Sequence, residues 1–188
     1  MFTRRIDDDL ELRLLEERDA EALFAIFEAD REYLTQWLDW PNRYKTLEEC
    51  KGYVSHFRRL FAEGKGMNSA MVYKGKLVGA CDLYEINMAV RKATLGYWIA
   101  QEYQGKGIVT KSCRSVLAYA FETMSLNRVA LQFKRANAER ENYRSRAMAE
   151  RLGFVHEGSE RQGGMTNGEC QDMVTYSLLA KEWREADA

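Results

Sequence analysis

Residues 96–110 constrain the fold of this chain more than any other stretch. Residues 96–100 (Gly-Tyr-Trp-Ile-Ala) are aromatic and apolar, which is the composition of a buried strand. Residues 104–107 (Gln-Gly-Lys-Gly) follow as a glycine-rich loop, and from Ile108 onward apolar residues recur at helical spacing. A strand, a glycine loop and a helix in this order direct several backbone N–H groups at one spot. The stretch therefore predicts a pyrophosphate site, to which Lys106 adds a positive charge.

An ordinary tight turn between a strand and a helix is the alternative interpretation of the two glycines. The known phosphate loops do not match, because a Walker loop needs G-x-x-x-x-G-K-[ST] and a dinucleotide fold needs G-x-G-x-x-G. The sequence around Gly105 and Gly107 has neither spacing. The loop by itself therefore leaves the identity of the ligand open.

Composition and charge limit the class of protein. The chain has 188 residues, of which 46% are hydrophobic and 30% charged, so we expect one soluble globular domain spanning residues 1–188. A net charge of -1 offers no surface for nucleic acid. The sequence has no apolar leader at its start and no apolar run of membrane-spanning length. We therefore expect a cytoplasmic protein with neither a nucleic-acid nor a membrane partner.

The cysteines and histidines argue against a metal site. The four cysteines, Cys50, Cys81, Cys113 and Cys170, are widely scattered and form no C-x-x-C pair, which favours free thiols in a reducing compartment. Only two histidines are present, so we expect neither a zinc centre nor a histidine-based catalytic triad.

Periodicity and turn signals predict an α/β (α+β) fold with one mixed sheet. Thr46 and Glu49 have the spacing of a helix capping box, and Lys74-Gly75 has the composition of a hairpin turn. Gly153 stands where a helix should end. The expected strands cover residues 11–15, 70–73, 76–84, 93–100, 127–133, 154–157 and 173–179, and the expected helices lie around residues 22–27, 34–38, 47–63, 108–121 and 144–152.

The glycine loop resembles a known cofactor-binding motif. Residues 104–109 are similar to the acyl-CoA pyrophosphate loop of the GNAT superfamily of N-acetyltransferases, Q/R-x-x-G-x-G/A, with Val109 in place of the last Gly or Ala. The chain as a whole resembles the ribosomal-protein serine and alanine N-acetyltransferase branch over nearly its entire length. The matching segments are residues 12–14, 37–40, 96–110, 127–129, 142–145, 149–154, 157–158, 167–168 and 172–176.

The resemblance implies a GNAT-like domain with a mixed, mostly antiparallel sheet of six to seven strands, flanked by helices and splayed between two central strands. In this family the pantetheine arm of acetyl-CoA fills the splay, and a bulge near residues 98–100 would direct an N–H group at the thioester oxygen. Core packing of the aromatic side chains in this strand is the alternative. The expected contacts to acetyl-CoA or CoA are Trp98, Ile99, Ala100, Gln104, Gly105, Lys106, Gly107, Ile108, Val109, Thr110 and Asn142.

Asn142 and Ser145 match the Asn-x-x-Ser segment that precedes the penultimate helix in this branch. The resemblance implies that Asn142 contacts the cofactor and that the Ser145 hydroxyl lies near its sulfur as a hydrogen-bond donor. Both residue types also cap helices, and capping is compatible with catalysis. Tyr143 is a second candidate for the acid.

The general base is harder to identify. Two carboxylates familiar from relatives fall on Gly164 and Thr94 in this chain, so both are missing. Glu85, Asp82 and Glu157 are the alternatives, and we favour Glu85 acting through a water molecule. An α-amine has a pKa of about 8, so even a weak base would serve.

Residues 134–141 are an apparent insertion relative to the family. Counting forward from residues 127–129 places the family asparagine at Asn137, whereas counting back from residues 152–154 places it at Asn142. Either a longer helix begins at Asn137, or residues 138–141 form a loop and Asn142 keeps its role. We favour the loop, because Asn142 and Ser145 then both serve the helix start.

The resemblance implies an acetyl-CoA-dependent N-acetyltransferase that acts on a protein N-terminal α-amine of the ribosomal-protein type. A small-molecule amine acetyltransferase and a non-catalytic acyl-CoA-binding module are the alternatives, the latter because of the two missing carboxylates. The acceptor and the oligomeric state, including a homodimer, stay open at this point.

Overall fold

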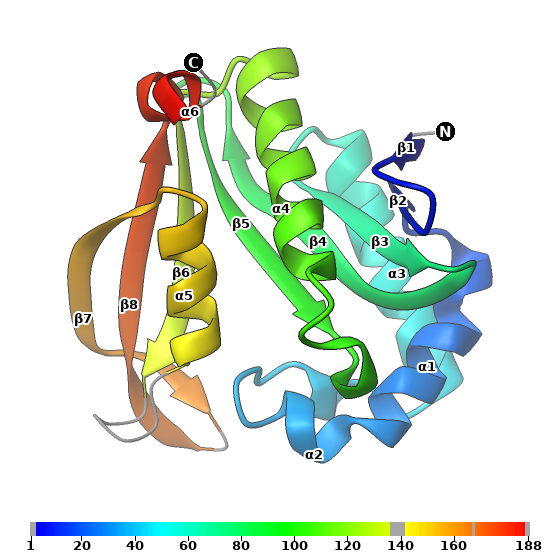
Figure 1. Cartoon of the computed structure of the whole chain (residues 1–188). Helices are drawn as coiled ribbons and strands as arrows, with labels where there is room; N and C mark the ends of the chain where they lie inside the picture. Colours follow the sequence, from blue (N-terminus) through cyan, green and yellow to red (C-terminus); the bar gives the residue numbers. More distant parts are fainter. Residues whose placement is uncertain (1–2, 136–141, 167, 187–188) are drawn as a thin grey trace.

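The computed structural model describes residues 3–135, 142–166 and 168–186. Within them the chain forms one open sheet of eight strands, one more than the upper end of the expected range, in the order β1-β2-β3-β4-β5-β6-β8-β7 (Figure 1). The extra strand is the short β1 at the edge. The strands are β1 (Thr3–Arg5), β2 (Leu10–Leu14), β3 (Met67–Tyr73), β4 (Lys76–Asn87), β5 (Lys92–Ile99), β6 (Arg128–Arg135), β7 (Val155–Thr166) and β8 (Glu169–Leu179).

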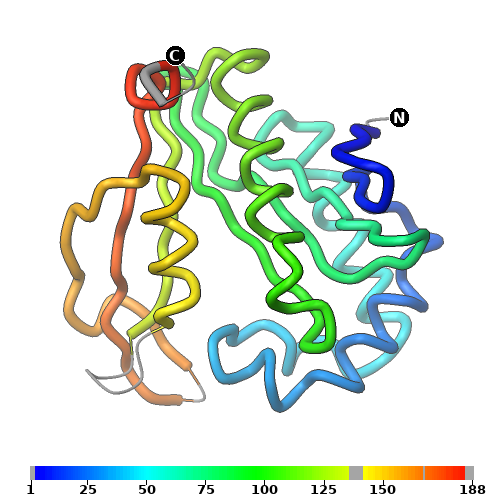
Figure 2. The backbone as a smooth tube through the Cα atoms, in the orientation of Figure 1, coloured from blue at the N-terminus to red at the C-terminus, as the bar shows by residue number. Residues whose placement is uncertain are grey.

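Helices cover both faces of the sheet, and α2 crosses below it (Figures 1 and 2). The capping box predicted for the longest helix, α3, is confirmed, since Thr46 and Glu49 each accept from the other's backbone N–H. The helices are α1 (Ala20–Ala29), α2 (Arg31–Leu34), α3 (Leu47–Ala62), α4 (Ile108–Ala118), α5 (Tyr143–Arg151) and α6 (Ala180–Ala186), with short turns η1 (Glu17–Asp19), η2 (Pro41–Arg43), η3 (Gln101–Tyr103) and η4 (Tyr119–Thr123). None of the helices in these described ranges is long and apolar enough to cross a membrane.

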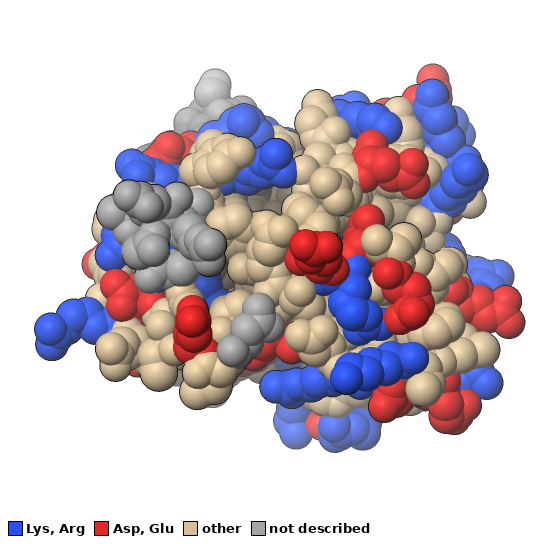
Figure 3. Space-filling model, turned by 90° about the horizontal axis from the view of Figure 1, so that it is seen from below, with Lys and Arg blue, Asp and Glu red and all other residues tan. Residues whose placement is uncertain are grey.

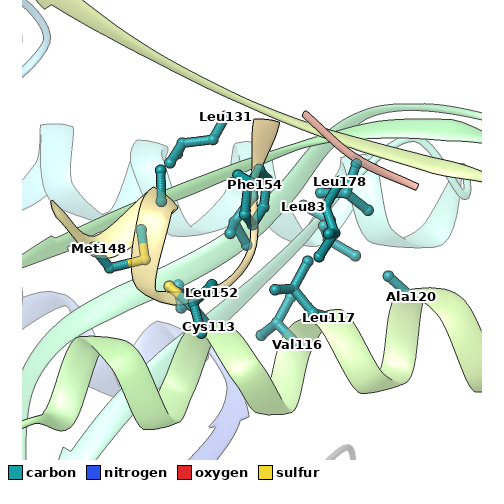
Figure 4. Close-up of a cluster of buried hydrophobic side chains, with 14 of the residues drawn as sticks. Leu83, Cys113, Val116, Leu117, Ala120, Leu131, Met148, Leu152, Phe154 and Leu178 are labelled. Atoms are coloured by element: carbon teal, nitrogen blue, oxygen red, sulfur yellow. Dashed lines mark hydrogen bonds between the residues drawn. The ribbon is translucent and has the colours of Figure 1, made fainter. Parts of the chain in front are cut away.

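Two hydrophobic clusters hold the layers together. On one face α4 and α5 pack on the sheet, where Cys113 and Leu117 of α4 meet Met148 of α5 and strand residues such as Leu131 (Figure 4). On the other face α1 and α3 pack around an aromatic group of Phe27, Trp40, Tyr53 and Trp98. Successive residues of β5 therefore face different layers, as expected for a strand buried on both sides.

The two central strands, β5 and β6, separate midway along their length, which confirms the predicted splay. β5 and β6 are the parallel pair of the sheet, and their pairing runs only from Lys92–Arg128 to Leu95–Leu131. Beyond these pairs both strands continue, to Ile99 and Arg135, and they diverge toward the lower end of the molecule (Figures 1 and 2). The sheet is thus open between its two halves over the second half of each strand.

The prediction of a bulge at residues 98–100 is wrong. In this described part of the sheet β5 pairs regularly with β4 from Gly79–Ile99 to Tyr84–Thr94. The regular approach depends on Gly79, because a Cβ there would collide with the carbonyl oxygen of Trp98. The irregularities nearest to these residues lie between Met71 and Val72 of β3 and between Tyr84 and Asn87 of β4.

Helix α5 begins as the loop alternative predicted. Tyr143 is its first residue, and the Asn142 side chain caps it by accepting from the backbone N–H of Ser145 at 3.1 Å. Asn137 and residues 138–141 lie outside the described residues, as does Asn167 of the C-terminal hairpin.

Candidate active site

A large cleft of about 2250 Å³ passes through the opening between β5 and β6. Its walls include residues from both faces of the sheet, with Tyr97, Ser145 and Met148 on the α4–α5 side and Tyr53 and Asp82 on the α1–α3 side. Figure 3 shows the molecule from below, with both acidic and basic residues around uncharged ones. Two molecules that enter from opposite faces of the sheet can therefore meet in this opening.

The edge of β5 offers backbone groups to the cleft. The Ala100 N–H donates to the Val78 carbonyl oxygen of β4 at 2.8 Å. Hydrogen bonding alternates along an antiparallel pair, so Trp98 also bonds to β4, whereas Tyr97 and Ile99 direct their N–H and C=O groups toward β6. Of the expected contacts, Ile99 therefore has peptide groups facing the opening, and those of Trp98 and Ala100 face β4.

The glycine loop is shaped as an open cradle. Gly105 and Gly107 have φ values of 72° and 75°, a left-handed conformation that favours glycine. No heavy atom lies within 4 Å of a Cβ built on either residue. Gly107 is the N-cap of α4, so the free N–H groups of the first helical turn face the cleft, which Val109 and Thr110 also line. The Ile108 side chain is buried and anchors the turn.

Lys106 points away from this cradle. Its ammonium group lies 4.8 Å from the centroid of the Tyr103 ring. The residue lines a separate pocket of about 310 Å³, together with Asp7 and Lys111, which form an ion pair of 2.6 Å. Its charge therefore faces the edge of the sheet, on the far side of the loop from the large cleft.

Two arginines of α5 take positions beside the loop that sequence reasoning missed. Arg151 donates to the Thr110 hydroxyl at 3.1 Å, and Arg144 donates to the side-chain oxygen of Gln104. The Gln104 amide in turn donates to the Tyr33 hydroxyl, which links α2 to α5 through the loop. The seven-residue spacing of the arginines, two helical turns, is the signal that could have placed both on one face of α5.

Ser145 is fixed from two directions. Its N–H is held by the Asn142 cap, and its Oγ accepts a 2.8 Å hydrogen bond from the hydroxyl of Tyr97. Burial raises the pKa of Tyr97, so the phenol stays protonated and remains a donor at neutral pH. Tyr143 also lines the cleft, but its side chain is exposed and lies against Arg144.

The acidic wall lies on the opposite face of the opening. Glu85 has φ of +53° at the irregularity that ends regular β4–β5 pairing, and its carboxylate accepts from the Thr94 hydroxyl at 3.1 Å. A carboxylate thus stands next to Thr94, one of the two positions at which the resemblance leads us to expect an acidic residue. Asp82 lies against Gly96, and burial raises the pKa of this carboxyl to about 7.

Glu157 is held in a structural ion pair. Arg128 donates to both carboxylate oxygens, at 2.5 and 2.6 Å, and the Ser177 hydroxyl donates at 2.7 Å. The hydrogen bond with Arg128 is the largest cause, and together these bonds lower the pKa of Glu157 to about 2. The residue is therefore a poor proton acceptor at neutral pH, which argues against it as the general base.

The basic residues at the start of the insertion form ion pairs, and Lys134 also lines the large cleft. Lys134 pairs with Asp39 of the α2–η2 segment at 3.7 Å and donates to the Met165 carbonyl at 2.6 Å. Arg135 pairs with Asp172 at 3.4 Å. The third basic residue of this segment, Arg140, lies outside the described ranges.

Among the described residues, no group of three or more His, Cys, Asp or Glu side chains could hold a metal ion.

The chain has clear relatives among known proteins. Residues 9–155 match the family model described as an acetyltransferase (GNAT) domain. A putative ribosomal N-acetyltransferase, YdaF, of Bacillus subtilis is 40% identical over 186 residues, covering 97% of this chain and 98% of that protein. The crystal structure of a probable acetyltransferase is similar, with a TM-score of 0.88, 38% identity and coverage of 97% and 99%. RimL, a ribosomal alpha-N-protein acetyltransferase in complex with coenzyme A, has a TM-score of 0.88, 25% identity and coverage of 95% and 98%.

Proposed function

Because the chain belongs to the GNAT acetyltransferase family and is an N-acetyltransferase, we propose that it transfers the acetyl group of acetyl-CoA directly to a protein N-terminal α-amine of the ribosomal-protein type. The observation that carries the proposal is the cleft through the sheet, which joins the glycine cradle on one face to the acidic wall on the other. A cofactor and an amine can meet there without sharing an entrance.

The cofactor side fits a CoA molecule. The backbone of residues 104–110 and the first turn of α4 would bind the pyrophosphate, with Arg151 and Thr110 beside it. The pantetheine arm would pair with the free edge of β5 at Ile99. Asn142, at the start of α5, would border this arm. In this arrangement Trp98 and Ala100 act by holding β5 to β4, and Lys106 contributes through its backbone.

The chemistry requires a proton acceptor for the amine and a donor for the departing thiolate. Ser145 would donate its hydroxyl proton toward the sulfur, since its Oγ already accepts from Tyr97. Tyr143, also in the cleft, is the second candidate. Glu85 would accept the amine proton through water, because its carboxylate is exposed on the acceptor wall and oriented by Thr94.

The test is a thiol-release assay with acetyl-CoA over a panel of N-terminal peptides and small amines. We expect release with peptides that carry a free α-amine and none with the same peptides after N-terminal acetylation. Turnover of small amines alone would overturn the peptide acceptor. Binding of CoA without release for any amine would make the protein a non-catalytic module.

A further inference from the structure

We propose that Asp82 binds the acceptor as an ammonium ion and is the first group to receive its proton, with Glu85 passing that proton on to water. This inference rests on the proposed N-acetyltransferase function and refines its base, because Asp82 takes the place of the water molecule between the amine and Glu85. It follows from the position of Asp82 in the opening, from its lack of a charged partner, and from the space that Gly96 leaves for it.

The position of Asp82 is set by the sheet. Asp82 pairs with Gly96 of β5, the residue directly after Leu95, which is the last residue paired with β6. A Cβ on Gly96 would lie 2.8 Å from the Asp82 carboxylate, so glycine is required for the carboxylate to reach across β5. The carboxylate therefore stands at the start of the opening, on the face opposite Tyr97 and Ser145.

The surroundings of Asp82 leave its charge unbalanced. Among the described residues no side chain donates to its carboxylate or forms an ion pair with it, although protein atoms surround it except toward the cleft. The groups that face it are Tyr53 of α3, Tyr84 of β4 and Asn68 of β3, its cross-strand neighbour. Burial raises the pKa of both tyrosines, which therefore stay neutral. The other titratable residues that line the cleft near this wall include Asp30, Glu32, Tyr33 and Asp39 from the α2 region, and Tyr44, His56, Lys65, Glu85 and Lys134.

One buried atom near Asp82 also lacks a partner. The Asn68 side-chain nitrogen donates to the Tyr53 hydroxyl at 3.2 Å, whereas its oxygen has no hydrogen bond within the described chain. A protonated Asp82 would be a donor on the same face of the sheet as this acceptor. The wall is thus suited to a carboxyl group that gains and loses a proton during the cycle.

The proton balance of the step is complete. The acceptor ammonium gives one proton to the Asp82 carboxylate, and the resulting amine attacks the thioester carbon. A C–N bond forms and the C–S bond breaks, after which the second amine proton neutralises the CoA thiolate through Ser145. Asp82 then releases its proton to water by way of Glu85. The overall products are the N-acetylated acceptor, CoA thiol and one proton.

The pKa of Asp82, about 7, suits this transfer. Moving a proton from an α-ammonium of pKa about 8 to such a carboxyl is unfavourable by only roughly tenfold. The same transfer from a lysine ε-ammonium, with a pKa of about 10.4, is unfavourable by roughly a thousandfold or more. The acidity of this wall therefore favours an N-terminal amine over a lysine side chain.

The test compares pH profiles of kcat/KM for the wild type, Asp82→Asn and Glu85→Gln with a hexapeptide that begins with serine. The pH profile of kcat/KM for the wild type should be bell-shaped, with its two limbs near pH 7 and pH 8. In Asp82→Asn the profile should lose its lower limb, and kcat/KM should rise with pH as free amine accumulates. At pH 7 the kcat/KM of this variant should be at least tenfold below that of the wild type. Glu85→Gln should keep the bell at reduced height. Loss of the lower limb in Glu85→Gln but not in Asp82→Asn would overturn the assignment.

A second measurement needs no turnover and separates this inference from the function on which it rests. In carbon NMR of the CoA-bound protein, the Asp82 carboxyl, identified by its absence in Asp82→Asn, should titrate near pH 7. Millimolar glycinamide should lower that midpoint, whereas N-acetylglycinamide should not. A midpoint near pH 4, or one that glycinamide leaves unchanged, would refute the role of Asp82 even if the peptide is acetylated. Failure of every amine in the thiol-release assay would instead refute the enzyme function.

Discussion

The hydroxyl of Tyr97 in β5 donates a 2.8 Å hydrogen bond to the Oγ of Ser145 in the first turn of α5. The two residues are 48 positions apart in sequence, and one belongs to a strand of the sheet and the other to a helix packed on it. Since the buried phenol stays protonated, Ser145 acts as the acceptor of this bond and its own proton is free for a third group. A residue of β5 thereby orients the proposed acid of α5.

Tyr97→Phe should keep the ring packed while removing the hydroxyl that orients Ser145. Loss of one hydrogen bond in a water-poor site corresponds to a fall in kcat of about tenfold, with the KM for acetyl-CoA changed less than about twofold. Tyr73→Phe, on β3 away from the cleft, is the control and should leave both constants unchanged. Steady-state kinetics decide the matter: an unchanged kcat with a lower melting temperature would reduce Tyr97 to a packing residue.

Gly105→Val and Gly107→Val should abolish the rise in melting temperature that CoA produces in the wild type. Both positions have positive φ, and a β-branched side chain there would strain the loop and fill the open cradle. Gly64→Val is the matched control, because Gly64 has φ of 67° and open space around it but lies at the end of α3. CoA-dependent stabilisation in all three variants would exclude the loop as the pyrophosphate site.

Arg151→Ala should weaken CoA binding about fivefold to tenfold, because the variant loses a guanidinium positioned beside Thr110 and the start of α4. Arg146→Ala removes the same type of side chain from the same helix, where it pairs with Glu150, and should have little effect. Calorimetric titration with CoA distinguishes them. Equal weakening in both variants would indicate a general loss of positive charge.

Glu157→Gln should destabilise the protein at neutral pH and much less in acid. The ion pair with Arg128 lowers the folded-state pKa of Glu157 to about 2, below its ordinary value of 4.5. Its contribution is therefore fully present above pH 4.5 and is lost as the pH falls toward 2. Because the Glu157 side chain is 39% exposed, solvent screening reduces the effect to about 1 kcal/mol.

Urea unfolding at pH 7 and at pH 2.5 provides the measurement for Glu157→Gln. Glu160→Gln, on the same strand, is the control. A loss of stability that is equal at both pH values would show that Glu157 acts through packing and not through its charge.

Local signals in the sequence were enough to predict the elements that carry the cofactor side. The strand, loop and helix of residues 96–118 depend on composition, two glycines and helical spacing, all of which are local. The Asn142 cap was predictable for the same reason, since an N-cap and its partner are three residues apart. These features need no knowledge of the tertiary structure.

The acceptor side could not be predicted in the same way, because it depends on contacts between distant segments. The +53° φ of Glu85, which places its carboxylate beside Thr94, arises from a pairing irregularity that periodicity does not reveal. The direction of Lys106 depends on Tyr103 and on the packing of the N-terminal strands. Core packing is the alternative that the sequence offers for the aromatic side chains of this strand, and only the approach of α5 gives the Tyr97 hydroxyl a polar partner.

The short pairing between β5 and β6 has a mechanical consequence. Four residue pairs at one end of the two strands form the only strand-to-strand connection between the half-sheets in the described chain. Beyond them, the N–H groups of β5 and β6 that point toward the opening lack a strand neighbour to protect their amide hydrogens from exchange with solvent, whereas those that point toward β4 and β8 keep theirs. A linear ligand that hydrogen-bonds along the edge at Tyr97 and Ile99 would take the place of that neighbour. It would join the two halves as an added strand does, and slow amide exchange at residues it does not touch.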